Sequence, residues 1–204
     1  MIGIIDYGLG NINAFVNIFH RLHVPVKRLN APADFEGVDR LILPGVGAFD
    51  HAMESFTRSG LRETTEDRVL RRNTPVIGIC VGMQMLAGSS EEGRLPGLGW
   101  IPGVVKKFDE TKIPFATRLP HMGWNDVEVD SRAQIFQEFP QLPRFYFLHS
   151  YYFDCADPGD AVAWSDYGGR FTCAVMRKNI YGVQFHPEKS HHFGVQLLEN
   201  FSKL

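Results

Sequence analysis

Val76-Ile77-Gly78-Ile79-Cys80-Val81-Gly82-Met83-Gln84 is the most informative segment of this sequence for its architecture. A short apolar run typical of a buried strand leads into Gly-x-Cys-x-Gly, and residues compatible with a helix follow. Hydrolases with a Gly-x-Ser-x-Gly elbow hold their nucleophile on the same sharp strand-to-helix turn, where flanking glycines leave room for a strained backbone. A thiol there also lies at a helix N-terminus, whose dipole favours the thiolate. The pattern predicts a nucleophilic Cys80, although a buried cysteine ending a core strand fits the pentapeptide equally well.

Apolar runs and helix-like segments alternate through the first half of the chain. Ile2–Ile5 and Leu41–Leu43 indicate two more buried strands, the second stopped by Pro44-Gly45, and Asn11–Leu22 has apolar residues at helical spacing. The mostly polar segment Ala48–Leu70 should divide into two helices at Gly60. Strands that are apolar throughout are typical of parallel sheets covered on both faces. We therefore predict an α/β fold with a mostly parallel central sheet flanked by helices.

The second half of the chain adds further short strands. They are rich in aromatic and β-branched residues, and glycine-containing turns separate some of them. The predicted strands are Arg144–Leu148, Ala161–Ser165, Thr172–Met176 and Tyr181–Phe185. A final helix is expected over about His191–Phe201. Because no repeat, low-complexity tract or linker interrupts the sequence, residues 1–204 are predicted to form one domain with additional antiparallel strands.

The composition argues against several classes of protein. Of the 204 residues, 44% are hydrophobic, which is enough for a core and unlike a disordered chain. Lys and Arg number 21 against 23 Asp and Glu, and this net charge of −2 gives no sign of binding to nucleic acid or to an anionic membrane. Three cysteines make no disulfide framework and fit a reducing compartment. Without a signal peptide or a run of roughly 18 apolar residues, a soluble, cytoplasmic protein is expected.

A base and an orienting group for a thiol nucleophile are found near the C-terminus. His186 follows a predicted strand, and Glu188 comes two residues later. In an extended backbone, residues i and i+2 point to the same side, so Glu188 could reach the imidazole while Pro187 stiffens the pair. The carboxylate would then hold one tautomer of the ring and stabilise the imidazolium. His-Pro-Glu alone is a weak signal, but together with the Cys80 elbow it predicts a Cys-His-Glu triad.

Acyl transfer also needs donors for an oxyanion. The backbone N–H of Val81, directly after the nucleophile, is one expected donor. A second could come from Val46 in the turn 44–47, where neighbouring glycines allow the amides to face a ligand. Taken alone, this segment would also fit an ordinary tight turn.

Three patterns that would suggest a cofactor or metal site are incomplete in this sequence. Gly8-Leu9-Gly10 follows the first strand, but position 13 is Asn and no acidic residue lies about 20 positions on, as a dinucleotide site requires. His-Pro-Glu at 186–188 begins a zinc-deaminase signature whose Pro-Cys-x-x-Cys part is missing. His186, His191 and His192 lack further ligands at metal spacing. We expect neither a cofactor nor a metal.

The combined motifs resemble one family over nearly the whole chain. Gly-Ile-Cys-Val-Gly-Met-Gln at 78–84 and Gln-Phe-His-Pro-Glu-Lys-Ser at 184–190 are similar to the class I, or triad, glutamine amidotransferases. The 44–47 turn fits the same family. Asp-Tyr-Gly-x-Gly-Asn at 6–11, Pro-His-Met-Gly-Trp-Asn at 120–125 and Phe-Leu-His-Ser-Tyr at 147–151 narrow the resemblance to the glutaminase subunits of imidazole glycerol phosphate synthase.

The resemblance implies roles for individual residues. Cys80 would attack the side-chain amide carbon of L-glutamine, His186 would transfer protons, and Glu188 would orient His186. Water would hydrolyse the glutamyl thioester, and the amides of Val46 and Val81 would hold the oxyanion. The positions that match the family's glutamine-binding residues are Gln84, His149, Ser150 and Tyr151.

The resemblance also implies a partner. The family passes ammonia through a tunnel to a (βα)8-barrel synthase subunit of histidine biosynthesis, and this chain is too short to hold that domain as well. The residues that fall where the family meets the barrel are Met122, Trp124, Asn125, Tyr146 and Lys189.

Two residue-level departures and several alternatives qualify this prediction. Val81 stands where the family usually has Leu, and the segment 11–15 lacks the usual Ser and small residues. The second departure leaves open a paralogue that supplies ammonia for amidination of a surface-polysaccharide sugar. Alternatives of another kind are a free-standing cysteine hydrolase or peptidase, which the triad alone would allow, and a non-catalytic binding subunit.

Overall fold

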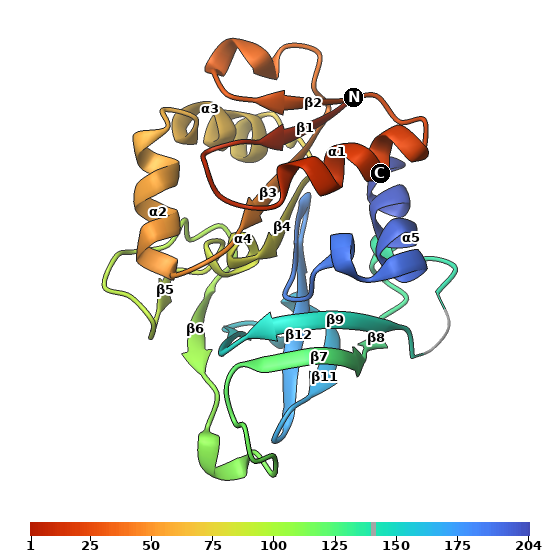
Figure 1. Cartoon of the computed structure of the whole chain (residues 1–204). Helices are drawn as coiled ribbons and strands as arrows, with labels where there is room; N and C mark the ends of the chain where they lie inside the picture. The colour runs from red at the N-terminus through yellow and green to blue at the C-terminus, as the bar shows by residue number, and fades with distance from the viewer. Residues whose placement is uncertain (140–141) are drawn as a thin grey trace.

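An eight-stranded mixed sheet forms the centre of the computed structural model, which describes residues 1–139 and 142–204 (Figure 1). In spatial order its strands are β2 (Val26–Leu29), β1 (Ile2–Ile5), β3 (Arg40–Gly45), β4 (Val76–Cys80), β13 (Ile180–Val183), β12 (Arg170–Arg177), β11 (Ala161–Asp166) and β8 (Glu128–Val129). Neighbours from β2 to β13 pair in parallel, and the remaining pairs are antiparallel. The predicted combination of a parallel core with antiparallel strands is confirmed.

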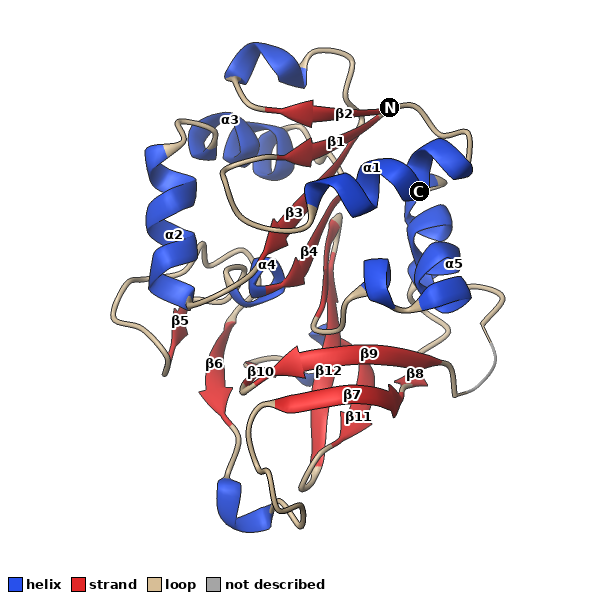
Figure 2. Cartoon of the chain, viewed as in Figure 1, coloured by secondary structure: helices blue, strands red, loops and turns tan. Residues whose placement is uncertain are grey.

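Two smaller sheets extend this core on the side where the parallel strands end (Figure 2). One contains β10 (Tyr151–Cys155), β6 (Gly103–Lys107) and β5 (Ser89–Ser90), and the other pairs β7 (His121–Asp126) with β9 (Arg144–His149). The helices are α1 (Ile12–Arg21), α2 (Phe49–Arg58), α3 (Arg62–Glu66), α4 (Val81–Gln84) and α5 (His191–Ser202). The two helices expected on either side of Gly60 are α2 and α3, and Gly60 has a positive φ of 73°.

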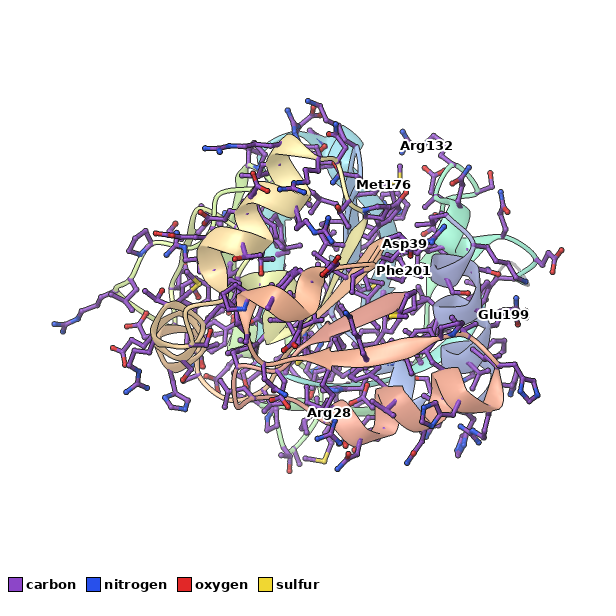
Figure 3. The ribbon with its side chains drawn as sticks, turned by 90° about the horizontal axis from the view of Figure 1, so that it is seen from above. Arg28, Asp39, Arg132, Met176, Glu199 and Phe201 are labelled. Atoms are coloured by element: carbon purple, nitrogen blue, oxygen red, sulfur yellow. The ribbon has the colours of Figure 1, made fainter. Side chains whose placement is uncertain are left out.

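Helices cover both faces of the parallel strands, as continuous apolar strands require. Seen from above, α1 and α5 lie along one side of the strands and α3 along the other (Figure 3). The apolar spacing in α1 buries Ile12, Phe15, Ile18 and Phe19, which confirms the predicted helix. Strand β4 is buried along its whole length between these layers, so the cysteine at its end is held in a rigid setting.

Strand β3 corrects one sequence prediction, because it runs on through Pro44 to Gly45 instead of stopping before them. Proline lacks the N–H group that donates an inter-strand hydrogen bond, so it occurs in strands only where no such bond is needed. Pairing with β1 has already ended at Ile42, while β4 remains paired up to Gly45 opposite Cys80. The carbonyl of Pro44 instead accepts a hydrogen bond from the Tyr7 hydroxyl at 2.6 Å.

Strand β13 is shorter than predicted, since it ends at Val183 rather than Phe185. Beyond that point the backbone leaves the sheet, and the N–H of His186 donates to the carbonyl of Tyr146 on β9 at 2.8 Å. This bond joins the two-stranded β7–β9 sheet to the carboxyl end of the parallel core. The carboxyl ends of β4 and β13, which are neighbours in the sheet, therefore meet β9 at one place.

Candidate active site

The elbow at Cys80 is built by close backbone contacts. Cys80 has φ 54° and ψ −113°, a strained conformation for a residue with a side chain, and α4 begins at the next residue. A Cβ on Gly82 would lie 1.9 Å from the carbonyl oxygen of Leu43, and one on Gly78 would lie 2.5 Å from that of Gly82. The glycines are therefore needed because the turn packs against β3 and against itself, which is the strained turn that the Gly-x-Cys-x-Gly pattern predicts.

His186 and Glu188 form a buried pair beside this elbow. The ring nitrogen Nδ1 lies 2.9 Å from Oε1 of Glu188, and the two side chains are only 5% and 3% exposed. The contact agrees with the prediction, but the backbone does not. Residues Pro187–Lys189 form a short 3-10 helix instead of an extended strand, and this turn carries the carboxylate to the ring.

The electrostatics of the site favour a charged imidazole. Burial by itself would lower the pKa of His186, but its hydrogen bonds to Cys80 and Glu188, and the negative charges of both groups, raise the pKa to about 10. His186 is therefore held as an imidazolium at neutral pH between the sulfur and the carboxylate. Such a ring stabilises a thiolate and can later release a proton to a leaving group.

Two polar side chains of the site were not predicted from the sequence: Gln184, which contacts the thiol, and Glu92, which lies farther away in the same pocket. The buried amide of Gln184 donates to Sγ of Cys80 at 3.7 Å, and its Oε1 accepts from Nε2 of Gln84 at 3.0 Å. Glu92 comes from the loop after β5 and accepts a hydrogen bond from the N–H of Phe49. Gln184 stands two residues before His186, so strand alternation could have indicated it, whereas no spacing pointed to Glu92.

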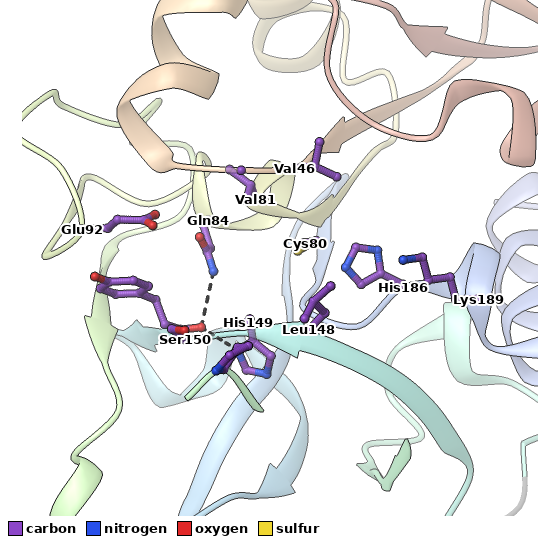
Figure 4. Close-up of a pocket in the computed structure, with 13 residues that line it drawn as sticks. Val46, Cys80, Val81, Gln84, Glu92, Leu148, His149, Ser150, His186 and Lys189 are labelled. Carbon is purple, nitrogen blue, oxygen red and sulfur yellow. Dashed lines mark hydrogen bonds between the residues drawn. The ribbon is translucent and has the colours of Figure 1, made fainter. Parts of the chain in front are cut away.

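The thiol opens into a pocket of about 300 Å³ (Figure 4). Cys80 and His186 lie at one end and Glu92 at the other, with Gln84 between them. The lining residues are Val46, Gly47, Cys80, Val81, Gln84, Glu92, Pro120, Leu148, His149, Ser150, Tyr151, His186 and Lys189. Every position matched to glutamine binding or to the oxyanion hole therefore borders this one pocket.

The residues matched to the partner surface divide between the two faces of β7. Met122 and Trp124 are exposed on one face, and Tyr146 on the neighbouring β9 lies edge-on to Trp124. Lys189 places its ammonium 5.7 Å from the centre of the Tyr146 ring. Asn125 belongs to the opposite face, where its Nδ2 donates to the carbonyl of Asp166 at 2.8 Å. The structure thus groups four of the five residues on one side of the β7–β9 sheet, and Lys189 connects this patch to the pocket lining.

The other cysteines lack the setting of Cys80. Burial raises the pKa of Cys155 to about 12, and burial also raises the pKa of Cys173. Both thiols therefore stay protonated at neutral pH and are poor nucleophiles. Within residues 1–139 and 142–204, no group of three His, Cys, Asp or Glu side chains is arranged to hold a metal ion. None of the helices in the described part of the chain has the length and hydropathy that a membrane crossing requires.

Comparisons with known proteins agree along the whole chain. A family model described as class I glutamine amidotransferase matches residues 3–204. The imidazole glycerol phosphate synthase subunits HisH of Bdellovibrio bacteriovorus and Leptospira borgpetersenii are 53% and 48% identical, each with 100% of both chains covered. Subunit HisH 2 of Pseudomonas aeruginosa is 45% identical, again over 100% of both chains.

Solved structures support the fold at lower identity. One glutamine amidotransferase structure has a TM-score of 0.73 at 20% identity and covers 100% of this chain and 99% of its own. Another, from Thermotoga maritima, has a TM-score of 0.63 at 20% identity, with 99% and 82% covered. The fold therefore agrees with the sequence relatives and with the strand-to-helix turn at Cys80. The chain belongs to the class I glutamine amidotransferases and, among them, to the HisH subunits of imidazole glycerol phosphate synthase.

Proposed function

We propose that the chain hydrolyses L-glutamine to L-glutamate and ammonia with Cys80, His186 and Glu188 as its triad. The buried Cys80–His186–Glu188 arrangement at the end of a pocket carries this proposal. The thiolate attacks the side-chain amide carbon, and His186 protonates the departing ammonia. Water then hydrolyses the thioester with His186 as base. The amides of Val46 and Val81 face the oxyanion in this scheme, since both residues border the pocket beside the sulfur.

The rest of the pocket suits the amino-acid end of glutamine. Glu92 lies at the end away from the sulfur, and burial raises the pKa of its carboxyl group. A nearby positive charge would stabilise the ionised form of this carboxylate, and the α-ammonium of bound glutamine would provide one. We therefore assign Glu92 to binding of the α-amino group. Gln84, together with the segment His149, Ser150 and Tyr151, borders the middle of the pocket, where the extended substrate would lie.

The ammonia would be delivered to a separate (βα)8-barrel synthase subunit of histidine biosynthesis, in a heterodimer. The patch formed by Met122, Trp124, Tyr146 and Lys189 supports this assembly, because Lys189 borders the pocket and the patch exposes large apolar side chains. Met122 is 62% and Trp124 40% exposed. We further propose that residues 1–204 act as one domain in the cytoplasm, where free cysteines persist.

The variant Cys80→Ala tests the catalytic assignment. It should abolish glutamine hydrolysis, while the barrel subunit paired with this variant should still use added ammonium. The matched control is Cys155→Ala, which removes a thiol away from the elbow and should leave glutamine turnover unchanged. Retained glutaminase activity in Cys80→Ala would refute the role of Cys80. Cleavage of peptides by the lone wild-type chain would instead favour a free-standing hydrolase.

A further inference from the structure

A row of hydrogen bonds behind the pocket joins three side chains of the β7–β9 sheet. Nδ2 of Asn125 lies 3.3 Å from Nε2 of His121, and Nδ1 of His121 lies 3.0 Å from Nε2 of His149. Nδ1 of His149 lies 2.7 Å from the carbonyl oxygen of Tyr151, a residue of the pocket wall. His121 and His149 are direct partners in the strand register, so the sheet itself sets the distance between the rings.

The direction of every bond in this row follows from its two ends. At one end the carbonyl of Tyr151 can only accept, so Nδ1 of His149 carries the proton and Nε2 is an acceptor. At the other end Nδ2 of Asn125 faces the Asp166 carbonyl, while its Oδ1 accepts from the N–H of Asp126. The amide nitrogen therefore faces His121 and donates to it. Both arguments place the single proton of each imidazole on Nδ1.

The rings are held rigidly in this arrangement. His121 is stacked between Phe147 and Tyr167, with ring centres 4.8 and 4.1 Å away and interplanar angles of 21° and 20°. His149 is packed against Phe108 and Phe171. Burial lowers the pKa of His121 to about 4 and that of His149 to about 3, so both rings are neutral at physiological pH. A neutral, oriented pair can transmit a fixed geometry to its final acceptor.

The final acceptor belongs to the glutamine pocket. The Tyr151 carbonyl receives Nδ1–H of His149 and, at 3.4 Å, Nε2–H of Gln84 (Figure 4). The neighbouring carbonyl of Ser150 accepts from the N–H of Phe108 at 3.2 Å. Protein donors therefore hold both carbonyls of this pocket wall, and the Tyr151 carbonyl is held by the last member of the hydrogen-bonded row, His149.

We propose that Asn125, His121 and His149 form a directed hydrogen-bond chain that positions the Ser150–Tyr151 wall and Gln84 for glutamine. The inference rests on the proposed glutaminase function and adds positioning residues to it. These side chains do not touch the reacting atoms, so losing the chain should raise KM for glutamine more than it lowers kcat. A hydrogen bond of this kind typically contributes about a factor of ten in an equilibrium constant.

The first test measures the tautomers directly in the full-length wild-type chain. Long-range ¹H–¹⁵N NMR at pH 7 should show His121 and His149 as neutral rings protonated at Nδ1. Asn125→Asp replaces the donating amide by a carboxylate and should disturb the His121 ring signals. The same change at the exposed Asn17 of α1, Asn17→Asp, should leave them unchanged. A proton on Nε2 of either wild-type ring would overturn the proposal.

The second test uses glutamine kinetics of the chain with its synthase partner. His121→Phe keeps the stacking but removes the donor to His149, and KM should rise about tenfold with kcat nearly unchanged. His121→Asn keeps a donor near the Nδ1 position and should restore most of the affinity. Wild-type KM in His121→Phe, or equal KM values in the two variants, would overturn the proposal. Absence of glutamine turnover by the wild type would instead refute the function on which it rests, whatever the tautomers.

Discussion

Glu188→Gln removes the charge that faces His186 and leaves a side chain of the same shape. Oε1 of Glu188 receives the ring Nδ1–H, while Oε2 is buried without a hydrogen-bond partner among the described residues. The carboxylate charge is therefore directed at the imidazole. The glutamine amide can still accept the Nδ1–H bond, so the substitution isolates the contribution of the charge.

The magnitude follows from the raised pKa of His186. A rise from 6.5 to about 10 corresponds to roughly 5 kcal/mol of preference for the charged ring, shared between Cys80 and Glu188. If Glu188 supplies half, its charge contributes roughly 2–3 kcal/mol, and kcat should fall on the order of 10²-fold. Because the folded pKa is raised, this ring stabilises the protein fully below pH 6.5 and loses that effect as pH rises through about 10.

The assay combines glutamine hydrolysis at saturating partner with an NMR titration of the His186 ring. In Glu188→Gln the ring should titrate well below its wild-type pKa, and urea unfolding should lose stability at a lower pH. Glu199→Gln, which removes a carboxylate paired with Lys203 on the surface of α5, is the control and should behave as wild type. A kcat within about threefold of wild type in Glu188→Gln, or an unchanged His186 pKa, would show that the Glu188 charge does not stabilise the imidazolium.

Tyr7→Phe removes the hydroxyl that holds the carbonyl of Pro44 in the turn 44–47, which carries Val46; glutamine kinetics should show kcat reduced about tenfold, and wild-type kcat would contradict this. Because burial lowers the pKa values of His121 and His149 to about 4 and about 3, urea unfolding should show stability falling as pH drops from 6.5 toward 3; a flat profile would contradict it. In Gly82→Ala the Cβ would lie 1.9 Å from a carbonyl oxygen, so thermal unfolding should show a loss of about 3 kcal/mol or more, whereas Gly88→Ala, with 3.6 Å of space, should be tolerated.

Local sequence patterns were sufficient for the elements whose partners are near in the chain. The elbow around Cys80 was predictable because strand, strained turn and helix are consecutive, and the helix over Ile12–Arg21 because its apolar spacing is strong. The His186–Glu188 contact was also predicted, although for the wrong backbone, since the 3-10 turn achieves what an extended strand was expected to do. The end of β3 was placed too early, because the general avoidance of proline in strands does not show that pairing with β1 has already ended at Ile42.

Local motifs alone identify the reacting groups and the family resemblance. How those groups meet depends on the three-dimensional packing of the chain. Cys80 and His186 face each other because β4 and β13 are adjacent parallel strands, and Glu92 reaches the same pocket from a loop. The face of β7 on which Asn125 lies, and hence its bond to His121, likewise depends on pairing with β9. Such contacts are set by strand register and burial, which join residues distant in the chain, so no local spacing could reveal them.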